Sequence, residues 1–212
     1  MPCGRRHGGF TMIEILVTLF ILAIGLLGLA GMQALAQKTE LESYQRAQAL
    51  ILLNDIIDRI RTNRPAATCY AITNPTGGTP YLGTTSGSHY NVGGFSCPSV
   101  STNPSAVARA GSDLAEIDNA LQGAAEAAGG ALVGSMIGAR ACIGFDANSQ
   151  SYSVAVAWQG ISKTFSPANW DASKTPATAR NCAVNQYGDL ADPLGDTQRR
   201  VVWNTLLIAT LK

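Results

Sequence analysis

One apolar stretch close to the N-terminus constrains the fold of this chain more than any other feature. Residues 10–36 have the sequence FTMIEILVTLFILAIGLLGLAGMQALA, and no charged residue occurs from Ile15 to Met32. A helix needs about 20 apolar residues to cross the hydrocarbon core of a bilayer. The stretch is long enough for this, so we expect residues 10–36 to form a transmembrane helix.

Residues 1–9, MPCGRRHGG, are polar and have no apolar region of their own. An ordinary secretory signal peptide contains such a region, so these residues predict a leader of another kind. Arg5 and Arg6 precede the apolar stretch, and positively charged flanks stay on the cytoplasmic side of a membrane. We therefore expect a cytoplasmic N-terminus, with the residues after Gln37 outside the inner membrane.

Glu14 is the one carboxylate within the apolar stretch, near its cytoplasmic end. A charged side chain at the centre of a bilayer costs about 2.5–3.5 kcal/mol on insertion scales, and the cost is smaller near the interface. Two interpretations stay open at this point. Glu14 either reaches the membrane interface as an isolated acid, or it waits for a cationic partner.

The segment Gly9-Phe10-Thr11-Met12-Ile13-Glu14, followed by the apolar helix, resembles the type IV prepilin cleavage and methylation motif. That motif has glycine before the cut, usually phenylalanine after it, and glutamate at the fifth mature position. The resemblance implies that prepilin peptidase cleaves between Gly9 and Phe10 and that the new Phe10 amine is N-methylated. By analogy with assembled pili, Glu14 pairs with the Phe10 amine of a neighbouring subunit, because an unpaired charge in a low-dielectric core is heavily penalised.

Three glycines, Gly25, Gly28 and Gly31, lie inside the predicted span. Small residues allow helices to approach closely in membranes, and glycine weakens a helix locally. In filaments of the pilin family, part of the N-terminal helix loses helicity on assembly, which makes Gly25 to Gly31 a candidate for that change. Ordinary membrane-helix glycines are the alternative.

Residues 37–64 predict an amphipathic continuation of the same helix. There is no proline or glycine from Gln37 to Arg61, and Asn63-Arg64-Pro65 ends the helix because proline disfavours a helical residue before it. Apolar residues recur at helical spacing, so we expect one stripe to be covered by a sheet. The expected stripe consists of Leu41, Tyr44, Ala47, Leu50, Ile51, Asn54, Ile57 and Ile60, and is widened by Leu53 and Ile56.

Residues 65–112 are rich in Gly, Pro, Ser, Thr and Asn, which indicates a long connecting loop. Residues 113–128 predict a short helix. Asp113 and Glu116 have the spacing of a capping box at its start, and Gly129-Gly130 follows as its end.

Three later segments predict strands: residues 139–145, 151–159 and 199–210, with residues 146–150 as a hairpin turn between the first two. The alternation within residues 151–159 places Tyr152, Val154, Val156 and Trp158 on one face, and Ser153, Ala155 and Ala157 on the other.

Together these elements predict an α+β, pilin-like fold. A long N-terminal helix, with a membrane half and an amphipathic half, would pack on a small antiparallel sheet in a periplasmic head formed by residues 65–212. Three or more antiparallel strands that pack against a helix make a stable arrangement.

Four blocks further along the chain extend the resemblance: LESYQRAQALILLNDIIDRI, SDLAEIDNALQGAAEA, VGSMIGARACI and YSVAVAWQG. They look like successive blocks of the type IV pilus modification protein family called PilV. The resemblance implies a minor pilin that takes part in type IV pilus assembly as a filament or tip-complex subunit, first in the inner membrane and then at the cell surface. It implies prepilin peptidase, other major and minor pilins and the pilus assembly platform as partners.

Two other functions share part of this pattern. A minor pseudopilin of a type II secretion system has the same leader, so the leader alone does not separate it from a pilin. A membrane-anchored periplasmic enzyme or ligand-binding protein is a third hypothesis, from a different functional class, and it would not require Glu14.

The chain contains five cysteines, of which Cys3 lies in the leader. Cys69, Cys97, Cys142 and Cys182 are scattered without CxxC spacing, which argues against a zinc site. In an exported domain four such cysteines predict two disulfides, with three possible pairings; free buried thiols are the alternative. A bridge between Cys69 and Cys97 would restrict much of the predicted loop.

We expect no catalytic residues, cofactor or metal. The only histidines are His7, which leaves with the leader, and His89, which lies in the segment SGSHYNVGG with no carboxylate close in sequence and indicates a solvated loop. Asp146-Ala147-Asn148 resembles the start of a calcium loop but lacks its distal glutamate, so a plain turn is expected. A net charge of +1 does not fit a nucleic-acid partner, which would usually bind a basic face.

The remaining candidates are aromatic or basic. Trp158, Trp170 and Trp203 could line a ligand groove, but for Trp158 and Trp203 we expect core packing on strands. Arg199-Arg200 is expected to flank the edge of a strand rather than to bind an anion.

Overall fold

The computed structural model describes residues 9–74, 77–97, 103–123, 127–128, 131–132, 136–164, 181–187 and 196–208. The chain divides into two compact units, Met1–Leu41 and Glu42–Lys212. The predictions for the leader and for Trp170 concern residues that lie outside the described ranges, apart from Gly9 at the end of the leader.

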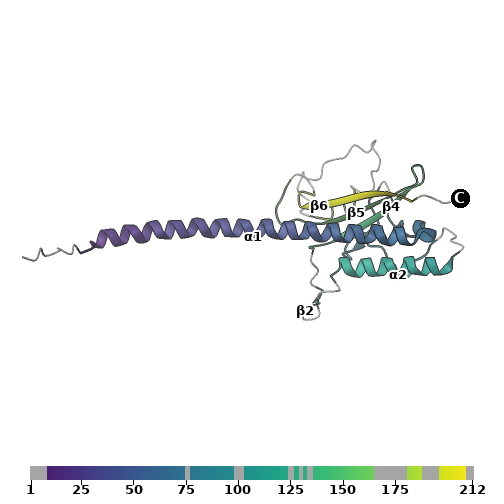
Figure 1. Cartoon of the computed structure of the whole chain (residues 1–212), viewed down its shortest axis with the longest axis horizontal. Coiled ribbons are helices and arrows are strands. Elements are labelled where there is room, and N and C mark those ends of the chain that lie inside the picture. Colours follow the sequence, from purple (N-terminus) through teal and green to yellow (C-terminus); the bar gives the residue numbers. More distant parts are fainter. Residues whose placement is uncertain are drawn as a thin grey trace, which may run out of the picture. The chain divides into compact units, whose positions relative to one another are not determined.

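A single helix, α1, runs from Met12 to Thr62 (Figure 1). It begins two residues later than expected and ends where Asn63 and Arg64 lead into a short 3-10 helix, η1, at Arg64–Tyr70. Among the described residues α1 is the one helix long and apolar enough to cross a membrane, with a mean hydropathy of 2.6 over its most apolar 18 residues. A long apolar N-terminal helix is therefore confirmed.

The outer part of α1 packs against the sheet of the head, as expected, but through a different stripe. Gln45, Ala49, Leu53, Ile56, Ile57 and Ile60 are buried. The prediction was right for the last four of these and wrong for Leu41, Tyr44, Ala47, Leu50, Ile51 and Asn54, which are exposed. The apolar surface of α1 is wider than the area that the sheet covers, and helical periodicity does not show which part of it faces the core.

The head contains a four-stranded antiparallel sheet in the order β1-β4-β5-β6. Its strands are β1 (Leu82–Gly83), β4 (Arg140–Asp146), β5 (Ser151–Gln159) and β6 (Arg199–Leu207). A two-stranded sheet of β2 (Ala127–Ala128) and β3 (Ala131–Leu132) stands apart from it. The α+β pilin-like arrangement of a long helix packed on a small antiparallel sheet is thus confirmed.

The segment expected to be a long loop contains regular structure. A second helix, α2, runs from Pro104 to Leu121, so the predicted start at Asp113 was wrong. Asn103 caps the helix, because its Oδ1 accepts a hydrogen bond from the Ala106 N–H at 3.2 Å, and Pro104 already has the φ angle of a first helical residue. A 3-10 helix, η2 (Val92–Gly94), lies further upstream.

Helix α2 also ends earlier than predicted. Gln122 follows its last residue, Leu121, and Gly123 then adopts a φ of 78°, a left-handed conformation that glycine accepts without steric cost. The predicted end, Gly129-Gly130, lies outside the described residues.

The two faces of the sheet belong to two apolar clusters. Tyr152, Val154, Val156 and Trp158 face the large cluster that includes α1 and α2, which agrees with the expected core packing of Trp158. The opposite face, with Cys142, Ala155 and Ala157, belongs to a smaller cluster that Val201 and the half-buried Trp203 adjoin. We call these the first and the second face.

Candidate functional site

The predicted processing site lies just before α1. The Thr11 carbonyl accepts hydrogen bonds from the N–H groups of Glu14, at 3.1 Å, and Ile15, at 3.4 Å, so the helix begins directly after Thr11. Gly9 and Phe10 precede the helix and are exposed, with 82% of the Phe10 surface accessible. A protease needs an accessible, non-helical backbone, and the Gly9–Phe10 peptide bond offers one.

Glu14 lies in the first turn of α1 and is exposed. The unpaired N–H groups of a first helical turn carry partial positive charge, which favours a carboxylate there. Thr11 and Glu14 also have the spacing of a capping box. Within the described part of the chain, no ion pair involves Glu14.

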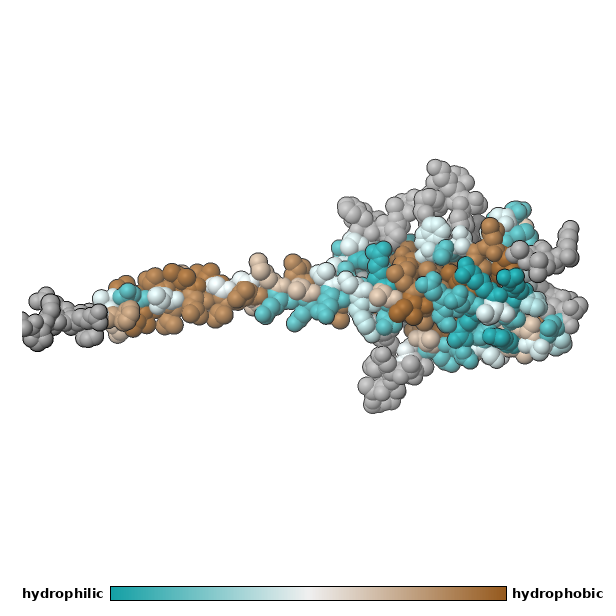
Figure 2. Space-filling view, viewed as in Figure 1, coloured by the Kyte–Doolittle hydropathy of each residue, from teal (hydrophilic) through white to brown (hydrophobic). Residues whose placement is uncertain are grey.

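The surface that follows Glu14 is apolar around the whole helix. Phe20, Ile24 and Leu27 are examples of large apolar side chains in this stretch that are more than half exposed, and Figure 2 shows apolar residues dominating the visible side of the N-terminal part of α1. Gly25, Gly28 and Gly31 are helical, and a Cβ atom built on any of them would have no neighbour within 4 Å. A surface of this kind suits lipid tails or the apolar sides of other helices.

His89 differs from its sequence-based prediction. Its Nε2 atom lies 2.8 Å from Oδ1 of the buried Asp118, so it is not a solvated loop residue without a carboxylate. Asp118 also accepts hydrogen bonds from the Gly83 N–H at 2.7 Å and from Gln122 Nε2 at 2.8 Å. The carboxylate therefore fastens β1 and the segment that follows it to α2, and its distance of 29 residues from His89 hid this pair from sequence reasoning.

Asp113, predicted as a helix cap, is instead a buried acid inside α2. Arg59 of α1 binds it through Nη1 at 3.0 Å and binds Glu116 at 2.6 Å. The Tyr70 hydroxyl donates to the second oxygen of Asp113. Burial, followed by this hydrogen bond, raises the pKa of the Tyr70 hydroxyl. The group connects α1, η1 and α2, and its geometry serves to hold the helices together.

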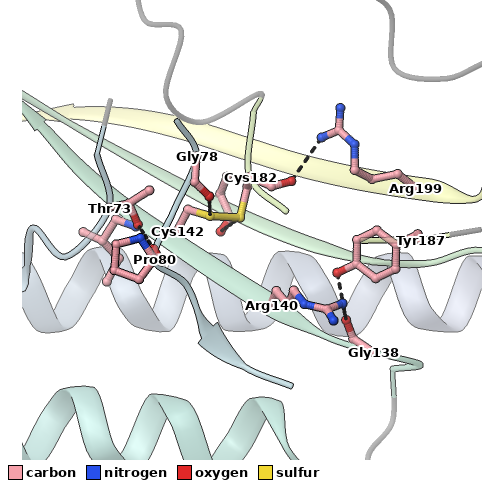
Figure 3. Close-up of a disulfide and its surroundings, with 11 residues drawn as sticks. Thr73, Gly78, Pro80, Gly138, Arg140, Cys142, Cys182, Tyr187 and Arg199 are labelled. Carbon is pink, nitrogen blue, oxygen red and sulfur yellow. Dashed lines mark hydrogen bonds between the residues drawn. A yellow bond between two sulfur atoms is a disulfide. The ribbon is translucent and has the colours of Figure 1, made fainter. Parts of the chain in front are cut away.

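Two disulfides bridge the four cysteines of the head. Cys69 bonds to Cys97, and Cys142 of β4 bonds to Cys182 (Figure 3). The second bridge lies on the second face of the sheet, where both of its residues are 0% exposed.

Arg199 is the first residue of β6, which forms one edge of the sheet, in agreement with the expected flank of a strand edge. Its side chain is buried, pairs with Asp196 at 3.0 Å through Nε, and donates from Nη1 to the Cys182 carbonyl at 3.2 Å. Burial lowers the pKa of Arg199, and the Asp196 carboxylate opposes that shift. Arg200 pairs with Glu42 of α1 at 3.5 Å.

The turn between β4 and β5 is a plain turn closed by its own side chains. Asp146 Oδ1 accepts from the Asn148 N–H at 2.9 Å, and Oδ2 accepts from the Ser149 hydroxyl at 2.8 Å. These hydrogen bonds lower the pKa of Asp146, that with Ser149 most. In the described ranges, no group of three or more histidine, cysteine or acidic side chains is arranged to hold a metal ion.

Comparison with known families gives one match, and it covers the N-terminal site. A family model described as the prokaryotic N-terminal methylation motif matches residues 4–30. No curated protein and no solved structure matches the chain. The motif and the long apolar helix fit a single-pass membrane anchor that prepilin peptidase processes and that associates with other pilins. They support a type IV pilin-like protein, a structural subunit rather than an enzyme.

Proposed function

We propose that this chain is a minor pilin that takes part in type IV pilus assembly as a filament or tip-complex subunit of the PilV type. In this proposal residues 1–9 are the leader and residues 10–36 form the transmembrane and later filament-core helix. Residues 37–64 carry the helix into the head, and residues 65–212 form the periplasmic head. The observation that carries the proposal is the methylation motif on an exposed, membrane-length apolar helix.

The chemistry of assembly follows from the two charges at the mature N-terminus. Cleavage between Gly9 and Phe10 creates an ammonium group, and N-methylation leaves it charged. When α1 leaves lipid for a bundle of helices, both this ammonium and Glu14 enter a low-dielectric core, where an unpaired charge is costly and a pair is attractive. Pairing of Phe10 in one subunit with Glu14 in the next therefore fixes the register between neighbours.

A minor pseudopilin of a type II secretion system is the second candidate, because the same motif and helix would serve it equally well. The two functions differ in where the mature protein ends up. A pilin is recovered in filaments sheared from the cell surface, whereas loss of a pseudopilin blocks the export of secreted enzymes.

The first experiment is mass spectrometry of the N-terminus of the protein from cells with and without prepilin peptidase. We expect a mature chain that begins at Phe10 and carries one additional methyl group, and intact precursor when the peptidase is absent. Gly9→Val should block cleavage, while Gly31→Val, inside the helix, should leave cleavage unchanged. Recovery of Met1 on the wild-type mature protein would contradict the proposed cut.

The second experiment separates processing from assembly. Glu14→Ala should be inserted and cleaved normally but lost from sheared filaments, whereas Glu40→Ala, an exposed acid on the same helix, should be incorporated at the wild-type level. Normal incorporation of Glu14→Ala would refute the pairing. A secretion defect in the deletion strain, with no protein in sheared filaments, would favour the pseudopilin.

A further inference from the structure

Residues 181–187, which we call the strap, lie across the second face of the sheet. Cys182, Ala183 and Tyr187 are buried in the cluster of that face, while Val184 and Asn185 are exposed. The side chains beneath the strap are small, namely Cys142, Ala155 and Ala157, so its backbone can lie close to the sheet. The Arg199 side chain donates to the Cys182 carbonyl within this close contact.

Arg140 of β4 holds the end of the strap. Its guanidinium carbon lies 5.1 Å from the ring centre of Tyr81 and 4.8 Å from that of Tyr187, so the cation stands between two aromatic rings. Nη1 donates to the Gly138 carbonyl at 3.1 Å, and Nη2 donates to the Ser86 hydroxyl at 2.6 Å. Figure 3 shows Tyr187 beside Arg140, with the Tyr187 hydroxyl also directed at Gly138.

Arg140 is a buried cation that, among the described residues, lies against aromatic rings instead of an acid. The residue is only 3% exposed, and buried arginines are normally paired with acids. Over the part of the chain that the structure describes, no carboxylate forms an ion pair with Arg140, and its Nε atom is buried without a hydrogen-bond partner. The two ring faces therefore stabilise the guanidinium together with its hydrogen bonds to Gly138 and Ser86, and cation–π contacts are strongest at desolvated sites.

The backbone of the strap is held in an uncommon conformation. Ala183 and Asn185 have φ values of 54° and 59°, in the left-handed region that L-residues other than asparagine and aspartate rarely adopt. Such residues persist where the surroundings hold them in place. For the strap, these surroundings are the Cys142–Cys182 bridge and the Arg140 sandwich, together with an Asp196 carboxylate that accepts from the Asn185 N–H at 2.9 Å.

The strap and the segment around Gly78, whose carbonyl lies 3.5 Å from Cys142 Sγ, together shield the bridge. Thiol–disulfide exchange requires a thiolate to reach one of the two sulfur atoms, and both Cys142 and Cys182 are 0% exposed. The other bridge differs, since Cys97 is partly exposed.

We propose that the strap is a latched cover whose latch is the Tyr81–Arg140–Tyr187 sandwich, and that the Cys142–Cys182 bridge exchanges with thiols only while this latch is open. Once the strap is open, a thiolate attacks one sulfur and forms a mixed disulfide with it, while the Cys142–Cys182 bond breaks and the other cysteine leaves as a thiolate; a second thiol then displaces the first and completes the reduction. In the reverse direction the Cys142–Cys182 bond forms while the disulfide of an oxidoreductase breaks, and that oxidoreductase accepts the two electrons and two protons and leaves as a dithiol. Closure then buries the finished bridge and makes the oxidised head resistant to reduction.

The test is the rate at which dithiothreitol reduces each bridge in the folded full chain. The chain carries Cys3→Ser and is kept in detergent micelles at mildly alkaline pH without denaturant. Samples are quenched with acid and alkylated, and peptide mass spectrometry then counts the modified cysteines. We expect Cys69–Cys97 to be reduced first and Cys142–Cys182 at least tenfold more slowly. Equal rates for the two bridges would overturn the proposal.

Variants of the latch provide the specific readout. Tyr187→Leu removes one ring and should accelerate reduction of Cys142–Cys182 by about ten- to thirtyfold, the loss expected for one desolvated cation–π contact. Tyr187→Phe keeps the ring and should have a smaller effect, while Tyr44→Leu, at an exposed tyrosine of α1, is the matched control. The Cys69–Cys97 rate in each variant serves as the internal reference.

Arg140→Met tests the cation directly and should match Tyr187→Leu, with the Cys69–Cys97 rate unchanged. If Arg140→Met does not fold, as judged by circular dichroism, the two Tyr187 variants decide the question. An unchanged Cys142–Cys182 rate in Tyr187→Leu, or equal acceleration of both bridges, would show that the sandwich is not a latch for this cover.

Discussion

The two faces of the sheet are covered by different means. On the first face, large side chains such as Val154, Val156 and Trp158 pack against α1 and α2. On the second face, Ala155 and Ala157 are small, so the backbone of the strap can lie close to the sheet, and the Cys142–Cys182 disulfide fixes it there. Burial of large side chains stabilises the first face, whose cluster also contains Cys69 of the other bridge, whereas the second face depends on a disulfide and on cation–π contacts.

The charged groups differ in the same way. On the first face, Arg59 of α1 pairs with two acids of α2. On the second face, Arg140 lies between two tyrosine rings. A helix with a broad apolar side gains most of its stabilising free energy from the burial of its side chains. A short strap buries little apolar surface, so it depends on a few specific contacts.

The largest expected effect is on the first face. Ile56 is 0% exposed, and Ile56→Ala should lower the free energy of unfolding of the head by about 3 kcal/mol, through lost burial and the cavity left behind. Ile51→Ala, on the same helix at a residue that is 62% exposed, should cost less than about 0.5 kcal/mol. Urea titration of the full chain in micelles, followed by tryptophan fluorescence, measures both. Similar losses for the two variants would mean that α1 does not cover the sheet through the Ile56 side.

The second face should respond to added volume instead. Ala155 is buried under the strap, so Ala155→Leu should lower the free energy of unfolding by about 2 kcal/mol through overpacking. It should also accelerate reduction of the nearby Cys142–Cys182 bridge, because the strap must lift to make room. The same titration and the dithiothreitol assay report the two effects. A variant as stable as the wild type would indicate that the second face is not close-packed.

The stability at alkaline pH tests the burial of one tyrosine hydroxyl in the cluster of each face, Tyr70 on the first and Tyr187 on the second. Burial raises the pKa of Tyr187, at the end of the strap, to about 12, and burial also raises the pKa of Tyr70, in the network around Arg59. Their contribution to stability is complete below the pKa of an unfolded tyrosine, near pH 10. Above it the unfolded chain loses these protons while the folded chain keeps them, so stability falls by up to about 1.4 kcal/mol per pH unit for each tyrosine.

Urea titrations between pH 9 and pH 11.5 measure this slope. Tyr187→Phe and Tyr70→Phe should each reduce it, and the double variant should reduce it by the sum, because the two residues lie in different clusters. Tyr44→Phe, on the exposed side of α1, serves as the control. A slope that stays unchanged in both single variants would contradict the burial of these hydroxyls.

Sequence reasoning reached the first face more readily than the second. The alternation in residues 151–159 predicted β5 with its exact bounds and identified Val154 and Val156 as a common face. Alanine occurs both in cores and on surfaces, so it does not indicate whether a strand face is buried. Ala155 and Ala157 therefore did not predict that the second face of the sheet is covered. The strap was also hidden, since its contacts with Arg140 and Tyr81 join residues far apart in the sequence.

The N-terminal site could be proposed from the sequence because the information for it is local. Gly9, Phe10 and Glu14 lie within one short segment, and the family match covers the same segment. The His89–Asp118 pair and the role of Asp113 depend on tertiary contacts. Local sequence alone therefore assigned His89 and Asp113 wrongly. Asn103-Pro104 did carry a local helix-start signal, which the Gly- and Ser-rich composition around it obscured.

The smallest expected effect concerns Asn103, the cap of α2, which is one of the helices that pack on the first face. Asn103→Ala removes the side-chain acceptor for the Ala106 N–H and should lower the free energy of unfolding by about 1 kcal/mol. Asn103→Asp keeps an acceptor and should recover most of this loss, while Ser112→Ala, at an exposed residue inside α2, should change stability by no more than about 0.5 kcal/mol. If α2 instead began at Asp113, Asn103 would lie in a loop, and its replacement by alanine would leave both stability and helix content unchanged. Circular dichroism alongside the urea titration separates these outcomes, because loss of a cap shortens the helix as well as destabilising it.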